Sequence, residues 1–292
     1  MGIITSDRFP EGEIFLRWIN GRFDKNKNYI GVTTGPTGSG KSYVDLRKAE
    51  LQHRRRFDEE FPIENCCFSV SELMQRVSSG DLRTGEVLIL EEAGVNIGSG
   101  DWQNKVVKMF NYVLQSFRSM NIGMLLNLPV LSMLSKQARQ LVHMHMETTG
   151  IDFDRKLCKV KPLVHQLNQH SGKSYWKYMR VKAGGKVVRV ERMSFGMPSE
   201  GLIKKYETKK EKFLADITIE FANTLRKLET AKLDKLVRRD LSEVQKEIKS
   251  KYMEGIPQTQ IANDVGIAQS SVSDHLQRMK KWGYSLEKPL IA

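Results

Sequence analysis

The sequence has few cysteines and no long apolar run, and both shortages limit what the chain can be. No stretch of the 292 residues approaches the ~18 consecutive apolar residues that a membrane-spanning helix needs, so membrane insertion is not expected. The opening residues, MGIITSDRFPEGE, lack the apolar segment of a secretory signal. Of the three cysteines, Cys66 and Cys67 are adjacent, a pattern that fits neither a disulfide framework nor a metal site. These absences favour a cytoplasmic protein.

Positive charge is concentrated in the second half of the chain. Residues 1–150 contain 18 Lys and Arg against 17 Asp and Glu, whereas residues 151–292 contain 29 against 17. A basic half of this kind attracts polyanions and raises the rate at which they are met. The alternative is a solvated surface whose charge serves solubility.

Apolar segments alternate with helix-like segments in the first half. Helices are expected at 41–57 and 71–77, and an amphipathic stretch covers 102–118. Strands are expected at 28–34, 66–70, 86–90, 122–128 and 141–147. Because helical segments separate these strands, we expect an α/β fold with a mostly parallel sheet flanked by helices.

The strongest motif is Gly35-Pro36-Thr37-Gly38-Ser39-Gly40-Lys41-Ser42, a complete G-x-x-x-x-G-K-S between an expected strand and an expected helix. Its glycines allow a tight turn whose backbone amides converge on phosphate oxygens at a helix N-terminus. Lys41 is predicted to bridge the β- and γ-phosphates, and the Ser42 hydroxyl to bind Mg²⁺. ATP is favoured over GTP because no Asn-Lys-x-Asp guanine motif follows.

Two acids and an amide are candidates for the rest of a hydrolysis site. Glu91 and Glu92 follow the apolar strand; Glu91, where Asp is more common, is expected to hold Mg²⁺, and Glu92 to be the catalytic base. Asn127 interrupts the next apolar strand and is expected to sense the γ-phosphate, although it could equally be a hydrogen-bonded turn residue before Pro129. Arg118 and Arg139 are candidate arginine fingers that act on a neighbouring subunit, or ordinary surface arginines.

Three segments together resemble the additional-strand P-loop ATPases, the FtsK/HerA superfamily of DNA pumps. They are GPTGSGKS at 35–42, VLILEEAG at 87–94 and FRSMNIGMLLNLPVLSML at 117–134. The chain is also similar to the compact ATPases of archaeal plasmids and viruses and to the Zot-like ATPases. The resemblance covers roughly residues 28–150 and implies a ring-forming, hexameric homo-oligomer that uses ATP and Mg²⁺ to move double-stranded DNA.

A second motif lies at 256–277. Ile261, Val265, Ile267, Val272 and Leu276 have the spacing of a helix-turn-helix core, Gly266 occupies the turn, and Gln269-Ser-Ser is expected to start and cap the second helix. That helix is predicted to enter the major groove of DNA. The side chains expected at base edges or phosphates are Gln269, Ser270, Ser271, Ser273 and Gln277, followed by Arg278, Lys280 and Lys281 on phosphates. A helical protein-interaction module would have the same core spacing.

Two smaller patterns each allow a functional and a purely structural interpretation. His143 and His145 share a strand face and could hold a metal, but no third ligand is evident, which favours packing. Three aromatic residues, Tyr175, Trp176 and Tyr178, alternate with basic residues; this could clamp nucleic acid, but a half-buried hairpin is favoured.

The expected organisation has three parts. A P-loop ATPase domain covers 1–200, with a β-hairpin region at 150–200; a helical linker covers 201–240, and a helix-turn-helix DNA-binding domain covers 241–292. The combination of acids and sensor favours an ATP-hydrolysing DNA translocase or packaging-type motor. One alternative is a nucleotide-switched transcriptional regulator. The other is a Zot-like assembly or export ATPase, and the absence of a membrane segment argues against this second alternative.

Overall fold

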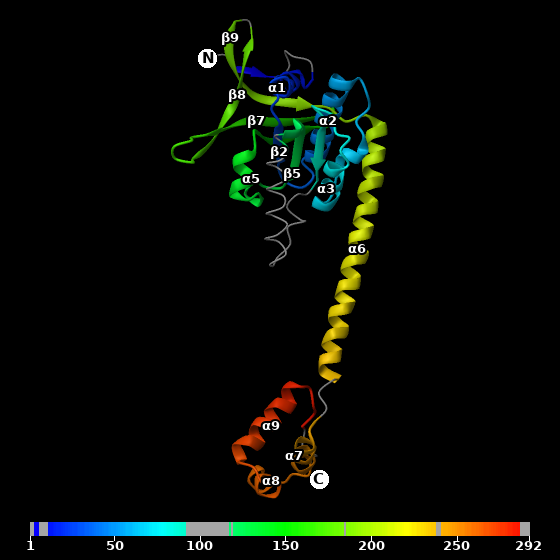
Figure 1. The fold of residues 1–292 in the computed structure, drawn as a ribbon, viewed down its shortest axis with the longest axis vertical. Helices are drawn as coiled ribbons and strands as arrows, with labels where there is room; N and C mark the ends of the chain where they lie inside the picture. The colour runs from blue at the N-terminus through cyan, green and yellow to red at the C-terminus, as the bar shows by residue number, and fades with distance from the viewer. Residues whose placement is uncertain are drawn as a thin grey trace. The chain divides into compact units, whose positions relative to one another are not determined.

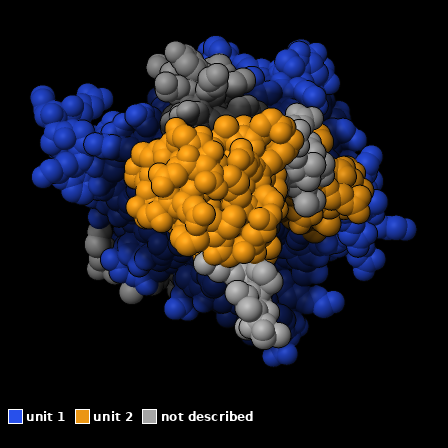
Figure 2. Space-filling model, turned by 90° about the horizontal axis from the view of Figure 1, so that it is seen from below, with its two compact units in different colours: residues 1–213 blue, residues 214–292 orange. Residues whose placement is uncertain are grey.

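The chain consists of two compact units, residues 1–213 and 214–292 (Figure 2). The computed structural model describes residues 3–5, 11–91, 117, 119–183, 185–237 and 241–286, with backbone only for 3–5 and 230–237. Helix α6 (Glu200–Val237) belongs to both units. Among the described helices, none is both long and apolar enough to cross a membrane.

Within the described residues, nine strands form one sheet in the first unit (Figure 1). Its parallel part has the order β6-β2-β5-β4-β3. These strands are β2 (Tyr29–Thr34), β3 (Cys66–Cys67), β4 (Val87–Leu90), β5 (Gly123–Leu128) and β6 (Met144–Asp152). Every residue of β2, β4 and β5 is buried, which explains their nearly continuous apolar sequence. The predicted α/β fold with a parallel core sheet is confirmed.

An antiparallel meander extends this sheet beyond β6. It consists of β7 (Leu157–Leu167), β8 (Ser174–Ala183) and β9 (Lys186–Phe195). Both β8 and β9 pair with the edge of β7 that faces away from β6. The first residues of β7 pair with β9, and its last residues pair with β8. The short β1 (Ile3–Thr5) runs parallel to β9. The meander expected from the turn signals is therefore present, and it is larger than a single hairpin.

Helices cover both faces of the sheet and form two apolar cores. One core joins α1 (Glu13–Phe23) and α2 (Lys41–Phe57) to the sheet through residues such as Phe15 and Tyr29. The other joins α3 (Val70–Ser78) and α5 (Lys136–Leu141) to it through residues such as Ile30 and Leu88. Tyr29 and Ile30 are adjacent on β2 and enter opposite cores, as the alternation of a strand requires. Short 3₁₀ turns lie at Ile63–Asn65 and Leu131–Met133.

Two expected boundaries were wrong, and hydrogen bonds to capping residues explain one of them. The strand expected at 66–70 ends at Cys67 because Ser69 caps α3: its Oγ accepts from the amide of Glu72 (3.0 Å), whose carboxylate accepts from the amide of Phe68 (2.8 Å). The helix therefore starts at Val70 rather than Ser71. The strand expected at 141–147 runs from Met144 to Asp152, since α5 still occupies Leu141.

In the described part of the second unit, three short helices follow α6. They are α7 (Glu243–Met253), α8 (Gln258–Val265) and α9 (Gln269–Lys281). The positions expected in a core include Ile261, Val272 and Leu276, and all three are buried there. Gly266, between α8 and α9, has a φ of 73°, a conformation that favours glycine.

The expected serine cap of α9 was wrong. The N-cap residue is Ala268, which offers no side-chain acceptor, and Ser270 and Ser271 already lie in the first turn of the helix. Ile267, two residues before α9 starts, packs against the core of this unit, and Ala268 follows it as the N-cap.

Candidate functional site

The phosphate-loop motif forms the connection from β2 to α2. Residues 35–40 link Thr34, the last residue of β2, to Lys41, the first residue of α2. Gly40, the N-cap of α2, has a φ of 85° and so adopts the left-handed conformation. The positive end of the α2 dipole therefore lies at the loop, as anion binding requires.

Gly35 is needed because β6 approaches the loop closely. A Cβ atom at Gly35 would lie 1.8 Å from the Oγ1 of Thr148, a residue of β6. That hydroxyl donates to the backbone oxygen of Thr34 (3.1 Å) and shares a hydrogen bond with the Ser39 hydroxyl, whose Oγ lies 2.7 Å away. Thr148 therefore holds the two ends of the loop together, and no larger residue fits at position 35.

Side chains from three elements meet at the end of α2 that faces the loop. The Ser42 hydroxyl donates to the Oε2 of Glu91 (2.9 Å), and the Nδ2 of Asn127 donates to the Ser42 Oγ (3.2 Å). Glu91 and Asn127 are buried. Because β4 and β5 are parallel neighbours, their carboxyl ends bring these polar groups to the same edge. The structure thus brings together both residues expected at Mg²⁺ and the expected sensor.

Lys41 and the remaining candidate residues lie at different places. The Nζ of Lys41 donates to the backbone oxygen of Pro36 (2.8 Å), so the side chain lies along the loop. Glu92 and Arg118 lie outside the described residues. Arg139 is in the last turn of α5. Four residues later, the amide of His143 donates to the backbone oxygen of Ile30, near the start of β2, so Arg139 lies next to the amino ends of the parallel strands. The structure therefore does not bring Arg139 to the phosphate loop of its own chain.

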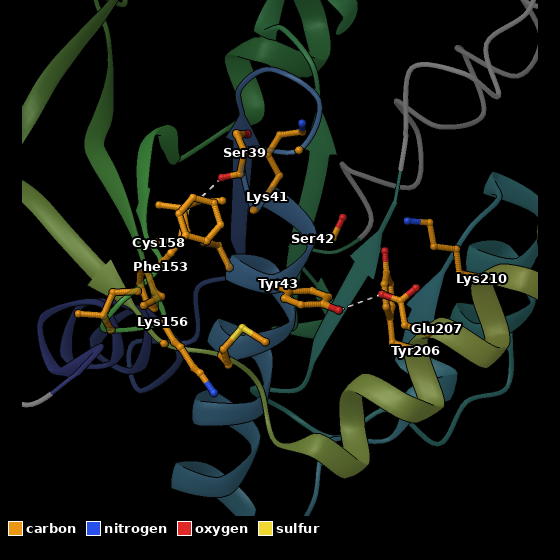
Figure 3. A pocket seen from close by; sticks show the side chains of 18 residues that line it. Ser39, Lys41, Ser42, Tyr43, Phe153, Lys156, Cys158, Tyr206, Glu207 and Lys210 are labelled. Atoms are coloured by element: carbon orange, nitrogen blue, oxygen red, sulfur yellow. Dashed lines mark hydrogen bonds between the residues drawn. The ribbon is translucent and has the colours of Figure 1, made fainter.

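A hollow of about 590 Å³ opens beside the loop (Figure 3). Residues 38–44 form its floor; Phe153, Lys156 and Cys158 line one wall, while Tyr206, Glu207 and Lys210 of α6 line the other. Further apolar lining comes from Ile151, Leu157, Phe195 and Met197. Phe153 is 80% exposed, unusually high for an aromatic residue next to a pocket. Sequence reasoning missed this hollow; an exposed aromatic in a turn, FDRK at 153–156, was the one available signal.

Hydrogen bonds connect the walls of the hollow to the phosphate loop and to helix α2. The thiol of Cys158 donates to the backbone oxygen of Ser39 (3.3 Å), and burial raises the pKa of this thiol to about 11. The hydroxyl of Tyr43 donates to Glu207 (3.1 Å). Burial raises the pKa of Tyr206 well above its ordinary value, and the Glu91 carboxylate raises it further. Cys158 and both tyrosines are therefore neutral at ordinary pH.

A buried ion pair lies directly behind the loop. The Nζ of Lys48 is 2.5 Å from the Oδ1 of Asp45 and donates to the Oγ1 of Thr33 (2.9 Å), which itself donates to Asp45 (2.6 Å). All three side chains are buried. Burial raises the pKa of Asp45, while the charge of Lys48 opposes that rise. The pair ties α2 to β2 on either side of the phosphate loop.

His143, directly before β6, and His145, within β6, both bond to residues of β2. The Nδ1 of His143 accepts from the amide of Ile30 (3.0 Å), and burial lowers the pKa of this histidine to about 3. The Nε2 of His145 lies 2.7 Å from the Oγ1 of Thr34, and Trp176 packs edge-on against its ring. No group of three or more possible metal ligands occurs in the part of the chain that the structure describes. Both histidines therefore pack within the sheet.

The exposed face of α9 carries most of the residues expected to contact DNA. Gln269, Ser270 and Gln277 are exposed, as are the three basic residues Arg278, Lys280 and Lys281; Ser271 and Ser273 are partly buried. Sequence reasoning missed Asp274, an exposed acid one turn after Ser270. A carboxylate there could accept only from a base amino group and would be repelled by phosphate.

The fold and the loop define the class: the first unit is an α/β domain of the P-loop NTPase type. No family model matches the chain, and no curated protein matches it. Among solved structures, the chain is similar to the N-terminal domain of zonular occludens toxin from Neisseria meningitidis. The identity is 14%, the match covers 52% of this chain and 95% of that one, and the TM-score is 0.30.

Proposed function

We propose that the chain is a Mg²⁺-dependent ATPase that acts on double-stranded DNA, as a translocase or packaging-type motor. The observation that carries the nucleotide part is the contact of Ser42 with Glu91 and Asn127 beside the phosphate loop. A hydroxyl and a carboxylate 2.9 Å apart are oxygen donors of the kind that Mg²⁺ prefers. A loop that only held an anion would not need them.

Each residue has a distinct part in the proposed reaction. The loop amides and Lys41 would hold the phosphates, and Ser42 and Glu91 would hold Mg²⁺, which when bound would supply positive charge beside the triphosphate. Glu92 orients and deprotonates the attacking water, and Asn127 contacts the γ-phosphate. Hydrolysis of the terminal phosphate breaks the bond to the β-phosphate oxygen and releases ADP and phosphate.

The base and ribose of the nucleotide fit the hollow beside the loop. Its floor is the first turn of α2, where the phosphate chain leaves the loop, and its walls are mainly apolar. Apolar walls with a few polar groups are typical of small-ligand pockets. We place the purine between Phe153 and the α6 wall, with Lys156 and Lys210 at the rim.

The proposed motor is a homo-oligomeric ring, and the place of Arg139 supports action between subunits. This residue lies near the edge of the sheet opposite its own phosphate loop, so any phosphate loop that it contacted would belong to a neighbouring subunit. Arg118 is the other candidate for this role. An arginine supplied from outside stabilises charge that develops on the transferred phosphoryl group.

The test is ATP turnover with and without long linear duplex DNA. We expect DNA of any sequence to stimulate turnover several-fold. We expect Lys41→Ala to abolish nucleotide binding, because Lys41 is the one cation in the loop sequence 35–42. Circular dichroism of this variant should match the wild type, since Lys41 is at the surface of the loop. An ATP turnover rate that is the same with and without DNA would contradict the proposed motor function.

The proposed DNA contacts predict two different defects on α9. Gln269→Ala should reduce the preference for one sequence over another, because the amide reads base edges. Lys281→Ala should weaken binding to all sequences alike and lower the salt dependence by about one phosphate contact. Fluorescence anisotropy with specific and scrambled duplexes, over a range of salt concentrations, separates the two. Equal binding by both variants and the wild type would exclude α9 as the contact surface.

A second candidate function is a nucleotide-switched transcriptional regulator. The favouring observation is that α7–α9 form their own apolar core, as a DNA-reading module does. A regulator would bind one site tightly and hydrolyse ATP slowly, with no stimulation by DNA of unrelated sequence. The same turnover measurement therefore decides between the two.

A further inference from the structure

One face of helix α6 is both apolar and exposed. Beyond Phe213, large apolar side chains recur at spacings of seven, four and three residues and are between 49 and 66% exposed; they are Leu214, Phe221, Leu225 and Leu228. Ile217, half-buried, lies on the same face. These spacings place all five on one side of a helix. We refer to these five residues as the α6 stripe.

The α6 stripe is larger than a solvent-facing helix ordinarily carries. None of its five described side chains belongs to the cores of either unit. A helix gains most of its stability in water from packing an apolar face, and contiguous exposed apolar surface marks a contact site. Single exposed apolar residues would need no such explanation, but five on one face do.

We propose that the α6 stripe pairs with the α6 stripe of a second copy of this chain, with the two helices antiparallel. Charge selects this orientation. Glu220 and Lys227 lie on the same flank of the stripe, one on each side of its midpoint, and both are exposed. In an antiparallel pair centred near residue 223, Glu220 of each helix faces Lys227 of the other helix. The pair therefore contains two such contacts between opposite charges. In a parallel pair this flank of one helix faces the opposite flank of its partner, so Glu220 and Lys227 do not meet.

The size of the contact fits a reversible pair. Five side chains that each lose on the order of 100 Å² of exposed surface bury about 1,000 Å² over both helices, near the lower limit for a specific interface. The pair should therefore dissociate on dilution. It depends only on α6 and not on the proposed nucleotide chemistry.

The experiment measures the molar mass of the full chain by light scattering, without nucleotide or DNA. Phe221→Glu places a charge in the centre of the stripe, so the wild type should have twice the mass of this variant at the same concentration. Ile219→Glu is the matched control: Ile219 is 60% exposed on the opposite face of the same helix. The control should keep the wild-type mass.

The orientation is tested by exchanging the flanking charges. Glu220→Lys and Lys227→Glu should each weaken the association roughly tenfold, and the double exchange should restore it, because opposite charges again meet. A wild-type chain that is monomeric at every concentration overturns the proposal, as does an Ile219→Glu variant that dissociates like Phe221→Glu. A double exchange that fails to restore the association overturns the antiparallel arrangement.

Discussion

Replacement of Lys48 by methionine should lower the free energy of unfolding of the first unit by about 3–5 kcal/mol, the typical result of removing one partner of a buried ion pair. Methionine has a similar length and fills the same space, so the loss comes from the charge. Asp45 would remain buried with Thr33 as its hydrogen-bond donor, but without the cation that contacts its carboxylate. Denaturant unfolding followed by circular dichroism and tryptophan fluorescence measures the change.

The double variant Asp45→Asn, Lys48→Met is the control for this prediction. It removes both charges but keeps an acceptor for Thr33, so it should be much more stable than the single variant. The defect of Lys48→Met should also depend on pH. Because burial raises the pKa of Asp45 in the folded state, the loss should be greatest near neutral pH and shrink as pH falls toward about 4, where the unfolded carboxyl also takes up its proton. A defect that is constant with pH would mean that packing, not charge, is responsible.

Glu92→Gln should leave ATP binding intact and lower the rate of hydrolysis by about 10²–10⁴ fold, the usual contribution of a general base. Glutamine keeps the size and hydrogen bonding of the side chain but cannot accept the proton of the attacking water. Glu92 directly follows Glu91, whose carboxylate accepts the Ser42 hydroxyl beside the phosphate loop. Single-turnover hydrolysis and binding of a fluorescent ATP analogue measure the two steps separately.

Glu91→Gln is the matched comparison, because it makes the same change one residue earlier. Its defect should appear as a weaker response to Mg²⁺ that high Mg²⁺ concentrations partly restore, since Glu91 is assigned to the metal. Glu92→Gln should not respond to added Mg²⁺. If Glu92→Gln hydrolysed ATP at the normal rate, the base would be another residue.

The sequence predicted the features that depend on local spacing. Helix α2 was expected at 41–57 and lies there, because Gly40, in the left-handed conformation, fixes its start. The turn at Gly266 was expected for the same kind of reason. The meeting of Glu91, Asn127 and Ser42 was also predicted, since neighbouring parallel strands end at one edge.

Features that depend on distant packing were not predicted. The pairing of Asp45 with Lys48 has the spacing of an ordinary surface pair on a helix, and only the fold shows that both side chains are buried. The hollow joins residues from the loop, the meander and α6, which no local pattern connects. The exposure of Asp274 among the basic, amide and hydroxyl residues of α9 follows from the packing of this helix and from no motif.

The pairing of β1 with β9 has a consequence for the synthesis of the chain. Ile3 lies opposite Arg189, and Thr5 opposite Arg192, so the first strand finds its place only when nearly 190 further residues exist. Contacts between such distant parts of a chain slow folding. During translation the phosphate loop and the parallel strands can assemble first, while the N-terminal segment waits for the last strand of the meander to leave the ribosome. A stalled chain that ends before residue 186 should therefore leave Ile3–Thr5 open to proteolysis, whereas chains long enough for all of β9 to have left the ribosome should protect this strand.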